Sequence, residues 1–240
     1  PYRPSRTLSN DIIHTNLDIA FDWGKQQANA SAVIAFKPYQ YPQSKLVLDA
    51  KSFQIKGVYL VNKTAPGTPP VSVSNGEKLK YDYDQRKLTI QLNKTYTRKD
   101  TVYVKIDYVA KPNELPRDHE DDHATDKGLY FINADGMDEG KPRQIWTQGE
   151  TEMNSAWFPT QDTPNEKMTH DFFITVDSKY KTLSNGLLKG EKDNGNGTRT
   201  DHWKQSIPHA PYLAMLAVGE FAVGKELMAN GLELSYYVEP

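Results

Sequence analysis

The feature that most constrains the fold is the alternation of apolar and polar residues with a period of two. In the first such segment Leu17, Ile19 and Phe21 alternate with their neighbours, and Ala32, Ile34 and Phe36 repeat the pattern. Further runs lie at residues 46–48, 55–60, 88–92, 102–108 and 129–132. Successive side chains of a β-strand point to opposite faces, so this period predicts strands with one buried face.

Turn sequences separate these runs. They include Pro66-Gly-Thr-Pro-Pro70, Asn75-Gly76 and Asn194-Gly-Asn-Gly197. Many strands with turns between them predict an all-β fold, an antiparallel multi-stranded sandwich. The strongest helix signal is a single turn after Pro164, which Asp162 or Thr163 would cap. We find no internal repeat, so we expect residues 1–240 to form a single domain.

The charge balance excludes some classes of partner. Lys plus Arg is 29 and Asp plus Glu is 31, a net charge of −2. This near-neutrality gives no reason to expect nucleic acid or an anionic membrane as partner. The longest apolar stretch, at residues 212–218, is too short for a membrane span. The chain has no cysteine, which excludes disulfides, thiol nucleophiles and cysteine-ligated zinc.

One segment matches the zinc-protease signature H-E-x-x-H. It reads His119-Glu120-Asp121-Asp122-His123. That signature requires a helix, on which both histidines face one zinc ion and the glutamate activates its bound water. Here both x positions are aspartate and the flanks are charged, so no apolar face would bury such a helix. We therefore interpret His119, Glu120 and His123 as a chance match in a solvated loop and predict no metal site in this chain.

Residues 144–176 carry a more specific pattern. Three motifs follow one another there: Thr147-Gln-Gly-Glu150, Phe158-Pro-Thr-Gln-Asp-Thr-Pro164 and Lys167-Met-Thr169. Further along, the chain reads Pro208-His-Ala-Pro-Tyr-Leu-Ala-Met-Leu-Ala-Val-Gly-Glu-Phe221. In order and spacing this resembles the N-terminal domain of the gluzincin aminopeptidases, the family of aminopeptidase N and leukotriene hydrolase. The chain departs from the family at Ser155, where an Arg is usual, and at Thr160, where a Cys is frequent.

The resemblance implies a saddle-like, non-catalytic β-domain of a zinc aminopeptidase. The family's zinc ligands lie in a catalytic domain that follows this one, and the chain ends at Tyr237-Val-Glu-Pro240, where that domain would begin. We therefore expect no cofactor in this chain, zinc in the parent enzyme, and no activity of the chain alone. The expected partners are the catalytic domain of the same polypeptide and a peptide substrate. The usual location of the members of this family also suggests a soluble protein in the periplasm or outside the cell.

By the same resemblance, Gln148, Gly149 and Glu150 are the candidate substrate-binding residues. Glu150 would bind the free terminal ammonium of a peptide, because a charge-assisted hydrogen bond favours the cation and fixes its position. Gln148 would line the pocket for the first side chain, and Gly149 would allow a close backbone approach. The aromatic residues Trp146, Trp157, Phe158 and Tyr212 are expected in the core.

Two other functions compete with this interpretation. A stand-alone sandwich with 14 Tyr and four Trp could bind carbohydrate or protein, which predicts aromatic side chains exposed together on one sheet. A small metalloprotease using His119 and His123 predicts stoichiometric zinc on a helix. His170, His202 and His209 have no partner at ligand spacing and are expected to be structural or surface residues.

Overall fold

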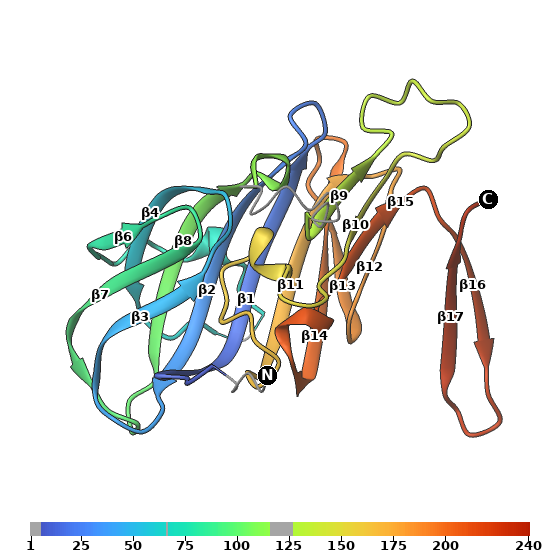
Figure 1. Ribbon diagram of the computed structural model, residues 1–240. Coiled ribbons are helices and arrows are strands. Elements are labelled where there is room, and N and C mark those ends of the chain that lie inside the picture. The colour runs from blue at the N-terminus through green and yellow to red at the C-terminus, as the bar shows by residue number, and fades with distance from the viewer. Residues whose placement is uncertain (1–5, 66, 116–126) are drawn as a thin grey trace, which may run out of the picture.

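An eight-stranded sheet forms the middle of the computed structural model, which describes residues 6–65, 67–115 and 127–240 (Figure 1). The strand order is β13-β14-β11-β1-β2-β8-β4-β5. The bounds are β1 (Asn10–Asp22), β2 (Gln27–Pro38), β4 (Phe53–Val61), β5 (Glu77–Lys78), β8 (Val102–Ala110), β11 (Met168–Asp177), β13 (Leu187–Asp193) and β14 (Thr198–His209). All neighbours pair antiparallel except β1 and β11, which are parallel.

Two smaller sheets and a separate hairpin complete the fold. The four-stranded sheet has the order β12-β15-β10-β9, formed by β12 (Lys181–Ser184), β15 (Leu216–Gly219), β10 (Gln144–Thr147) and β9 (Leu129–Ile132). The three-stranded sheet consists of β3 (Gln43–Asp49), β7 (Lys87–Tyr96) and β6 (Tyr81–Tyr83). The hairpin pairs β16 (Ala222–Leu227) with β17 (Glu233–Val238).

The predicted all-β class is confirmed. Helical structure within the described ranges is limited to four 3-10 turns: η1 (Pro70–Ser72), η2 (Pro112–Glu114), η3 (Asn154–Ala156) and η4 (Pro211–Leu213). The helical turn expected after Pro164 is absent, and Glu166 N donates to Thr163 O to close a simple turn instead. The parallel β1–β11 pair departs from a purely antiparallel sandwich, because a long crossover rather than a hairpin joins these strands.

The period-two pattern explains where the core lies. Leu17 and Ile19 of β1 are completely buried, as the alternation predicts, and pair with Phe172 and Ile174 of β11. The buried apolar residues form one cluster that takes members from the eight-, four- and three-stranded sheets. Apolar faces of different sheets therefore cover one another, which is the layered packing that a sandwich requires.

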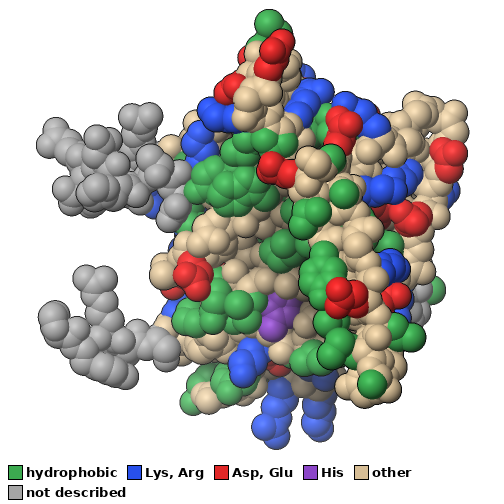
Figure 2. Space-filling model, turned by 90° about the vertical axis from the view of Figure 1, so that its right-hand side faces the viewer, with side chains coloured by type: hydrophobic (Ala, Val, Ile, Leu, Met, Phe, Trp, Pro, Cys, Tyr) green, Lys and Arg blue, Asp and Glu red, His purple; other side chains and the backbone are tan. Residues whose placement is uncertain are grey.

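The β16–β17 hairpin lies apart from the rest of the fold (Figure 1). It pairs with no strand of the other sheets in the described residues. Ten of the 15 exposed large apolar side chains lie between residues 187 and 238. They are Leu187, Leu188, Ile207, Leu213, Val223, Leu227, Met228, Leu232, Tyr236 and Val238. Figure 2 shows the side of the molecule on which the hairpin lies, with hydrophobic side chains at its surface. An isolated two-stranded hairpin is at best marginally stable in water, so this face is suited to covering by another surface.

None of the helical turns in the described part of the chain has the length and apolar character that a membrane crossing requires.

Candidate functional site

Residues 148–150 follow directly on β10, which lies between β9 and β15. The β9–β10 ladder continues one residue beyond the strand, because Gln148 N donates to Gly128 O at 3.0 Å. The side chains of Gln148 and Glu150 are exposed, whereas Gly149 is buried. The three residues singled out in the sequence thus meet at one strand end, with an amide and a carboxylate open to solvent.

Gly149 makes the closest backbone approach in this segment. A Cβ atom at this position would lie 2.2 Å from Tyr212 O and 2.6 Å from Asn154 Nδ2. Both distances are far below van der Waals contact, so every residue with a side chain would displace η4 or Asn154. The glycine is therefore required by lack of space beside Tyr212, and the backbone of 148–150 is seated against η4.

Hydrogen bonds hold both ends of the segment. On one side Thr147 Oγ1 accepts from Leu216 N at 3.0 Å and lies 3.4 Å from Leu216 O. On the other side Met153 N donates to Gly149 O at 2.9 Å, which closes a turn around Glu150. The carboxylate of Glu150 is therefore carried by a backbone that is fixed to β15 before it and to η3 after it.

Asn154 is a functional candidate that the sequence reasoning missed. Its side chain is completely buried and donates to Pro211 O at 2.6 Å and to Ala214 O at 2.7 Å. Its Oδ1 accepts from Trp157 Nε1 at 2.8 Å. An asparagine shortly before the apolar run Ala156-Trp-Phe158 is the signal that could have drawn attention to it, since buried amides are nearly always hydrogen-bonded.

The Phe-Pro turn that carries the family resemblance is fixed by two aspartates. Asp162 Oδ2 accepts from Ser155 N at 2.8 Å, and Asp162 N donates to Asp49 Oδ2 at 2.9 Å. Burial raises the pKa of Asp162 to about 6. Burial also opposes ionisation of Asp49, but hydrogen bonds from Lys87 and Arg6 outweigh it and lower the pKa of that carboxyl. Asp162 therefore holds the start of η3, close to Asn154.

The aromatic expectations are confirmed for Trp157 and Phe158, which are completely buried. Their ring centroids lie 4.5 Å apart, and both rings contact Phe172 edge-on. The expectation is wrong for Trp146, which is 38% exposed and stacks on Tyr130 with centroids 4.6 Å apart. Alternation along β10 turns Ile145 inward, so Trp146 must point outward. Tyr212 is only half-buried.

The segment with His119, Glu120 and His123 lies outside the described residues. Within residues 6–65, 67–115 and 127–240, no group of three or more histidine, cysteine or acidic side chains could hold a metal ion. The described histidines are His14, His170, His202 and His209, and they come from β1, β11 and β14 of one sheet. The structure thus offers no zinc-binding set in its described part.

The described histidines contact other side chains of the fold. His202 Nε2 lies 2.5 Å from Asp171 Oδ1, and His14 Nε2 lies 3.3 Å from Asp171 Oδ2. Lys204 Nζ adds a contact of 3.0 Å to the same carboxylate. Burial opposes ionisation of Asp171, but the hydrogen bonds from His14, His202 and Lys204 outweigh it and hold its pKa below the usual range. The rings of His170 and His209 contact each other with centroids 5.2 Å apart.

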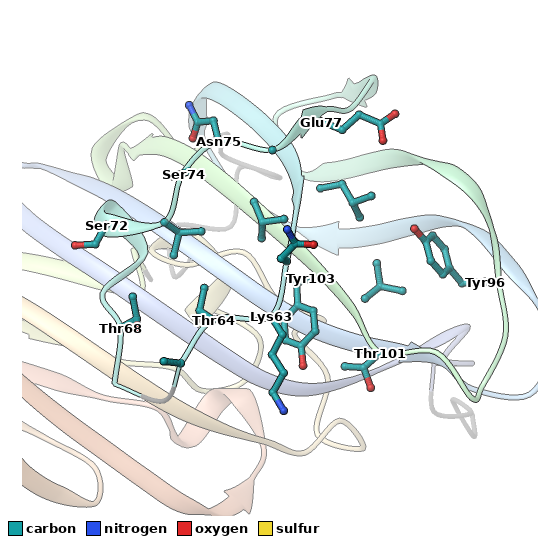
Figure 3. A pocket seen from close by; sticks show the side chains of 17 residues that line it. Lys63, Thr64, Thr68, Ser72, Ser74, Asn75, Glu77, Tyr96, Thr101 and Tyr103 are labelled. Atoms are coloured by element: carbon teal, nitrogen blue, oxygen red, sulfur yellow. The ribbon is translucent and has the colours of Figure 1, made fainter.

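A cavity of about 840 Å³ is shown in Figure 3. It opens between residues 62–65 and 72–76 on one side and the beginning of β8 on the other. Its labelled walls carry hydroxyl and amide groups, including Thr64, Ser72, Asn75 and Tyr103. None of Gln148, Gly149 and Glu150 lines it, so the candidate recognition segment is a feature of the surface rather than of this cavity.

Comparison with protein families gives a match over residues 11–213 to the peptidase M1 N-terminal domain. Leucine aminopeptidase 2 of Vanderwaltozyma polyspora is 35% identical over 112 residues, which cover 47% of this chain and 16% of that protein. Leucine aminopeptidase 2 of Neosartorya fischeri is 25% identical over 234 residues, which cover 92% of this chain and 34% of that protein. The chain thus spans about a third or less of the curated relatives it matches.

Solved structures with the same fold include a mutant M1 zinc metallopeptidase from Deinococcus radiodurans bound to a Tyr-Ser-Ala substrate. Its TM-score is 0.72 at 16% identity, over 95% of this chain and 46% of that one. Native yeast LTA4 hydrolase aligns with a TM-score of 0.70 at 19% identity, over 97% of this chain and 32% of that one. At this level of identity the structural likeness concerns the fold.

Proposed function

The chain belongs to the peptidase M1 N-terminal domain family, and from this membership we propose that it walls one side of the active-site cleft of a zinc aminopeptidase. In this proposal Gln148 and Glu150 help to recognise the free N-terminus and first side chain of a peptide. The observation that carries the proposal is the exposed Glu150 carboxylate on a backbone seated against Tyr212 O.

The chemistry of these side chains suits the recognition of an amino terminus. A peptide end presents an ammonium group, whereas an internal peptide nitrogen carries no charge. The Glu150 carboxylate would stabilise the ammonium through a charge-assisted hydrogen bond, and Gln148 offers both a donor and an acceptor beside it. Since the backbone of this segment is held by Leu216 and Met153, little ordering of the backbone opposes binding.

The zinc implied by the family is not assigned to the described part of this chain. The histidines in the described part of the chain contact Asp171, Thr169, Ala210 or one another. No group of three or more metal-ligating side chains lies together in that part. We therefore propose that the metal belongs to the catalytic domain of a longer protein, where it would activate water for hydrolysis. The role of this chain is then to bind and orient the peptide end.

The exposed apolar side chains between residues 187 and 238 support a docking partner within the same polypeptide. Relatives such as the D. radiodurans enzyme are about twice as long as this chain. Val223, Leu227 and Tyr236 of the hairpin are exposed. Within the described residues, the hairpin pairs with no strand of the other sheets. We propose that the catalytic domain covers this face and brings its zinc toward residues 148–150.

The alternative of a stand-alone binding module receives less support. It requires aromatic side chains exposed together on one sheet, but Trp157, Tyr108, Tyr180 and Phe172 are all buried. Among the described aromatic ring contacts, only Tyr130–Trp146 includes an exposed ring, that of Trp146. The family match over residues 11–213 also favours the aminopeptidase domain over this alternative.

The proposal is tested by measuring zinc content and hydrolysis of leucine 4-nitroanilide for this chain and for the longer protein that contains it. We expect stoichiometric zinc and activity only in the longer protein. His119→Ala in both proteins is the matched control for the H-E-x-x-H segment and should change neither result. Stoichiometric zinc and hydrolysis in the short chain, both lost with His119→Ala, would refute the proposal and support a small metalloprotease.

A further inference from the structure

Asn154 connects the candidate recognition segment with η4 and with the aromatic core. We propose that Asn154 is a positioning residue for the site: its side-chain amide fixes η4 relative to η3 and thereby sets where Gly149 and the flanking Gln148 and Glu150 lie. The inference rests on the proposed function, because it assigns Asn154 an effect on the binding of a peptide's amino terminus.

The hydrogen-bonding groups of this amide are all in use. Both N–H groups of Nδ2 donate, to Pro211 O at 2.6 Å and to Ala214 O at 2.7 Å. Oδ1 accepts from Trp157 Nε1 at 2.8 Å. An aspartate would have no donor for the two carbonyls, a serine would be too short to reach all three partners, and a glutamine would not fit a site where Asn154 is completely buried. The three partners therefore select asparagine.

The same amide contacts the recognition segment directly. A Cβ on Gly149 would lie 2.6 Å from Asn154 Nδ2 and 2.2 Å from Tyr212 O, so Gly149 is packed between Asn154 and η4. Met153, the residue before Asn154, donates its N–H to Gly149 O at 2.9 Å. Glu150 lies on the short turn between these two contacts. A shift of Asn154 must therefore move the backbone that carries the Glu150 carboxylate.

Removal of the amide would leave two buried groups, Ala214 O and Trp157 Nε1, without the partners they have in the fold, whereas Pro211 O keeps the hydrogen bond from Ala214 N. The two groups would have to find water or move toward other groups. Either change alters the distance between η3 and η4. A misplacement of about 1 Å at a binding group can cost up to ~100-fold in rate, so the loss should be visible in recognition of the amino terminus.

The test uses the longer protein and two zinc-binding probes, leucine hydroxamate and its analogue without the α-amine, 4-methylpentanoyl hydroxamate. The ratio of their inhibition constants reports recognition of the ammonium and cancels changes at the metal. We expect Asn154→Ala to lower this selectivity about 10-fold. Trp157→Phe removes the Oδ1 partner together with part of a buried ring but leaves both Nδ2 contacts, so it should lower the selectivity less. The matched control is Asn16→Ala, since Asn16 is also buried and donates to a loop carbonyl, Thr68 O, at 2.7 Å. It should reduce stability and leave the selectivity unchanged.

An unchanged selectivity in folded Asn154→Ala, or an equal weakening of both probes, overturns the inference. If Asn154→Ala does not fold, Trp157→Phe decides, and an unchanged ratio there overturns it as well. Glu150→Ala separates this failure from failure of the proposed function. A selective loss with Glu150→Ala but not with Asn154→Ala keeps the proposed function and removes the positioning role, whereas no selective loss with Glu150→Ala removes both.

Discussion

Gly149 lies so close to Tyr212 that a Cβ atom would be only 2.2 Å from the Tyr212 carbonyl oxygen. Residues 148–150 and η4 are about 60 residues apart in sequence, yet their backbones meet without an intervening side chain. This contact sets the position of the proposed recognition residues relative to the core, because Asn154 is hydrogen-bonded both to η4 and to the buried Trp157.

Gly149→Ala should therefore destabilise the domain. The added methyl group must displace the backbone of Tyr212 or the amide of Asn154, and we expect a cost of about 2–4 kcal/mol in the free energy of unfolding. Urea denaturation followed by tryptophan fluorescence measures it. Gly190→Ala is the matched control, since nothing lies within 4 Å of a Cβ there. Equal stability of both variants would show that the contact is not as tight as described.

Tyr108→Phe tests the buried link between the eight-stranded sheet and the Phe-Pro turn. Tyr108 Oη donates to Trp157 O at 2.9 Å, and both residues are completely buried. Loss of the hydroxyl leaves a buried carbonyl without this donor, which should cost about 1–2 kcal/mol. Tyr41→Phe, at an exposed position, should have no measurable effect on the same denaturation curve. A cost no greater than that of the control would contradict the assignment.

Glu166 should make the domain less stable as the pH rises. Burial raises its pKa to about 7 from 4.5, although Ile12 N and Lys167 N donate to the carboxylate. Between these values the unfolded chain releases the proton while the folded chain keeps it, so this contribution to stability falls from pH 4.5 to about pH 7. Glu166→Gln should flatten that part of the stability profile in urea titrations at several pH values. An unchanged slope would mean that Glu166 ionises normally in the fold.

Asp171 should have the opposite effect on the pH dependence of stability and make the domain less stable as the pH falls. Its lowered pKa, caused by hydrogen bonds from His14, His202 and Lys204 that outweigh burial, means that the folded state favours the carboxylate. This stabilisation is present above the ordinary aspartate pKa and is lost as the pH falls below it. Asp171→Asn should lower stability at neutral pH and weaken the acid-side loss. The control is Asp177→Asn, an exposed position on the same strand. Parallel acid profiles for wild type and Asp171→Asn would contradict the described contacts.

The features that sequence could predict are those encoded over a few residues. Alternation identified the buried face of β1 through Leu17 and Ile19, and the spacing from Gln148 to Asp162 identified the family-like segment. The exposure of Trp146 was mispredicted because aromatic character was given more weight than its place after the inward-facing Ile145. Apolar side chains are common on the outer face of a strand, so the type of a residue does not by itself decide whether its side chain is buried or exposed.

Contacts between distant segments were beyond the reach of the sequence. Asn154 bonds to carbonyls 57 and 60 residues away, and His14 meets Asp171 across the parallel β1–β11 pair. No local pattern indicates which strands become neighbours after a long crossover, so neither cluster could be predicted. The role that we propose for Asn154 follows only from its position between Gly149 and η4.

The most direct test of the central claim is the effect of Glu150→Gln in the longer protein on kcat/KM for leucine 4-nitroanilide. Gln keeps the size of the side chain and removes the charge that would bind the ammonium. We expect a fall of about 10–100-fold, the range of one hydrogen bond to a charged group. The control is Glu152→Gln, a second exposed carboxylate two residues further along, which should change kcat/KM by less than about twofold. Equal kcat/KM for the wild type and both variants would show that Glu150 does not recognise the peptide's amino terminus.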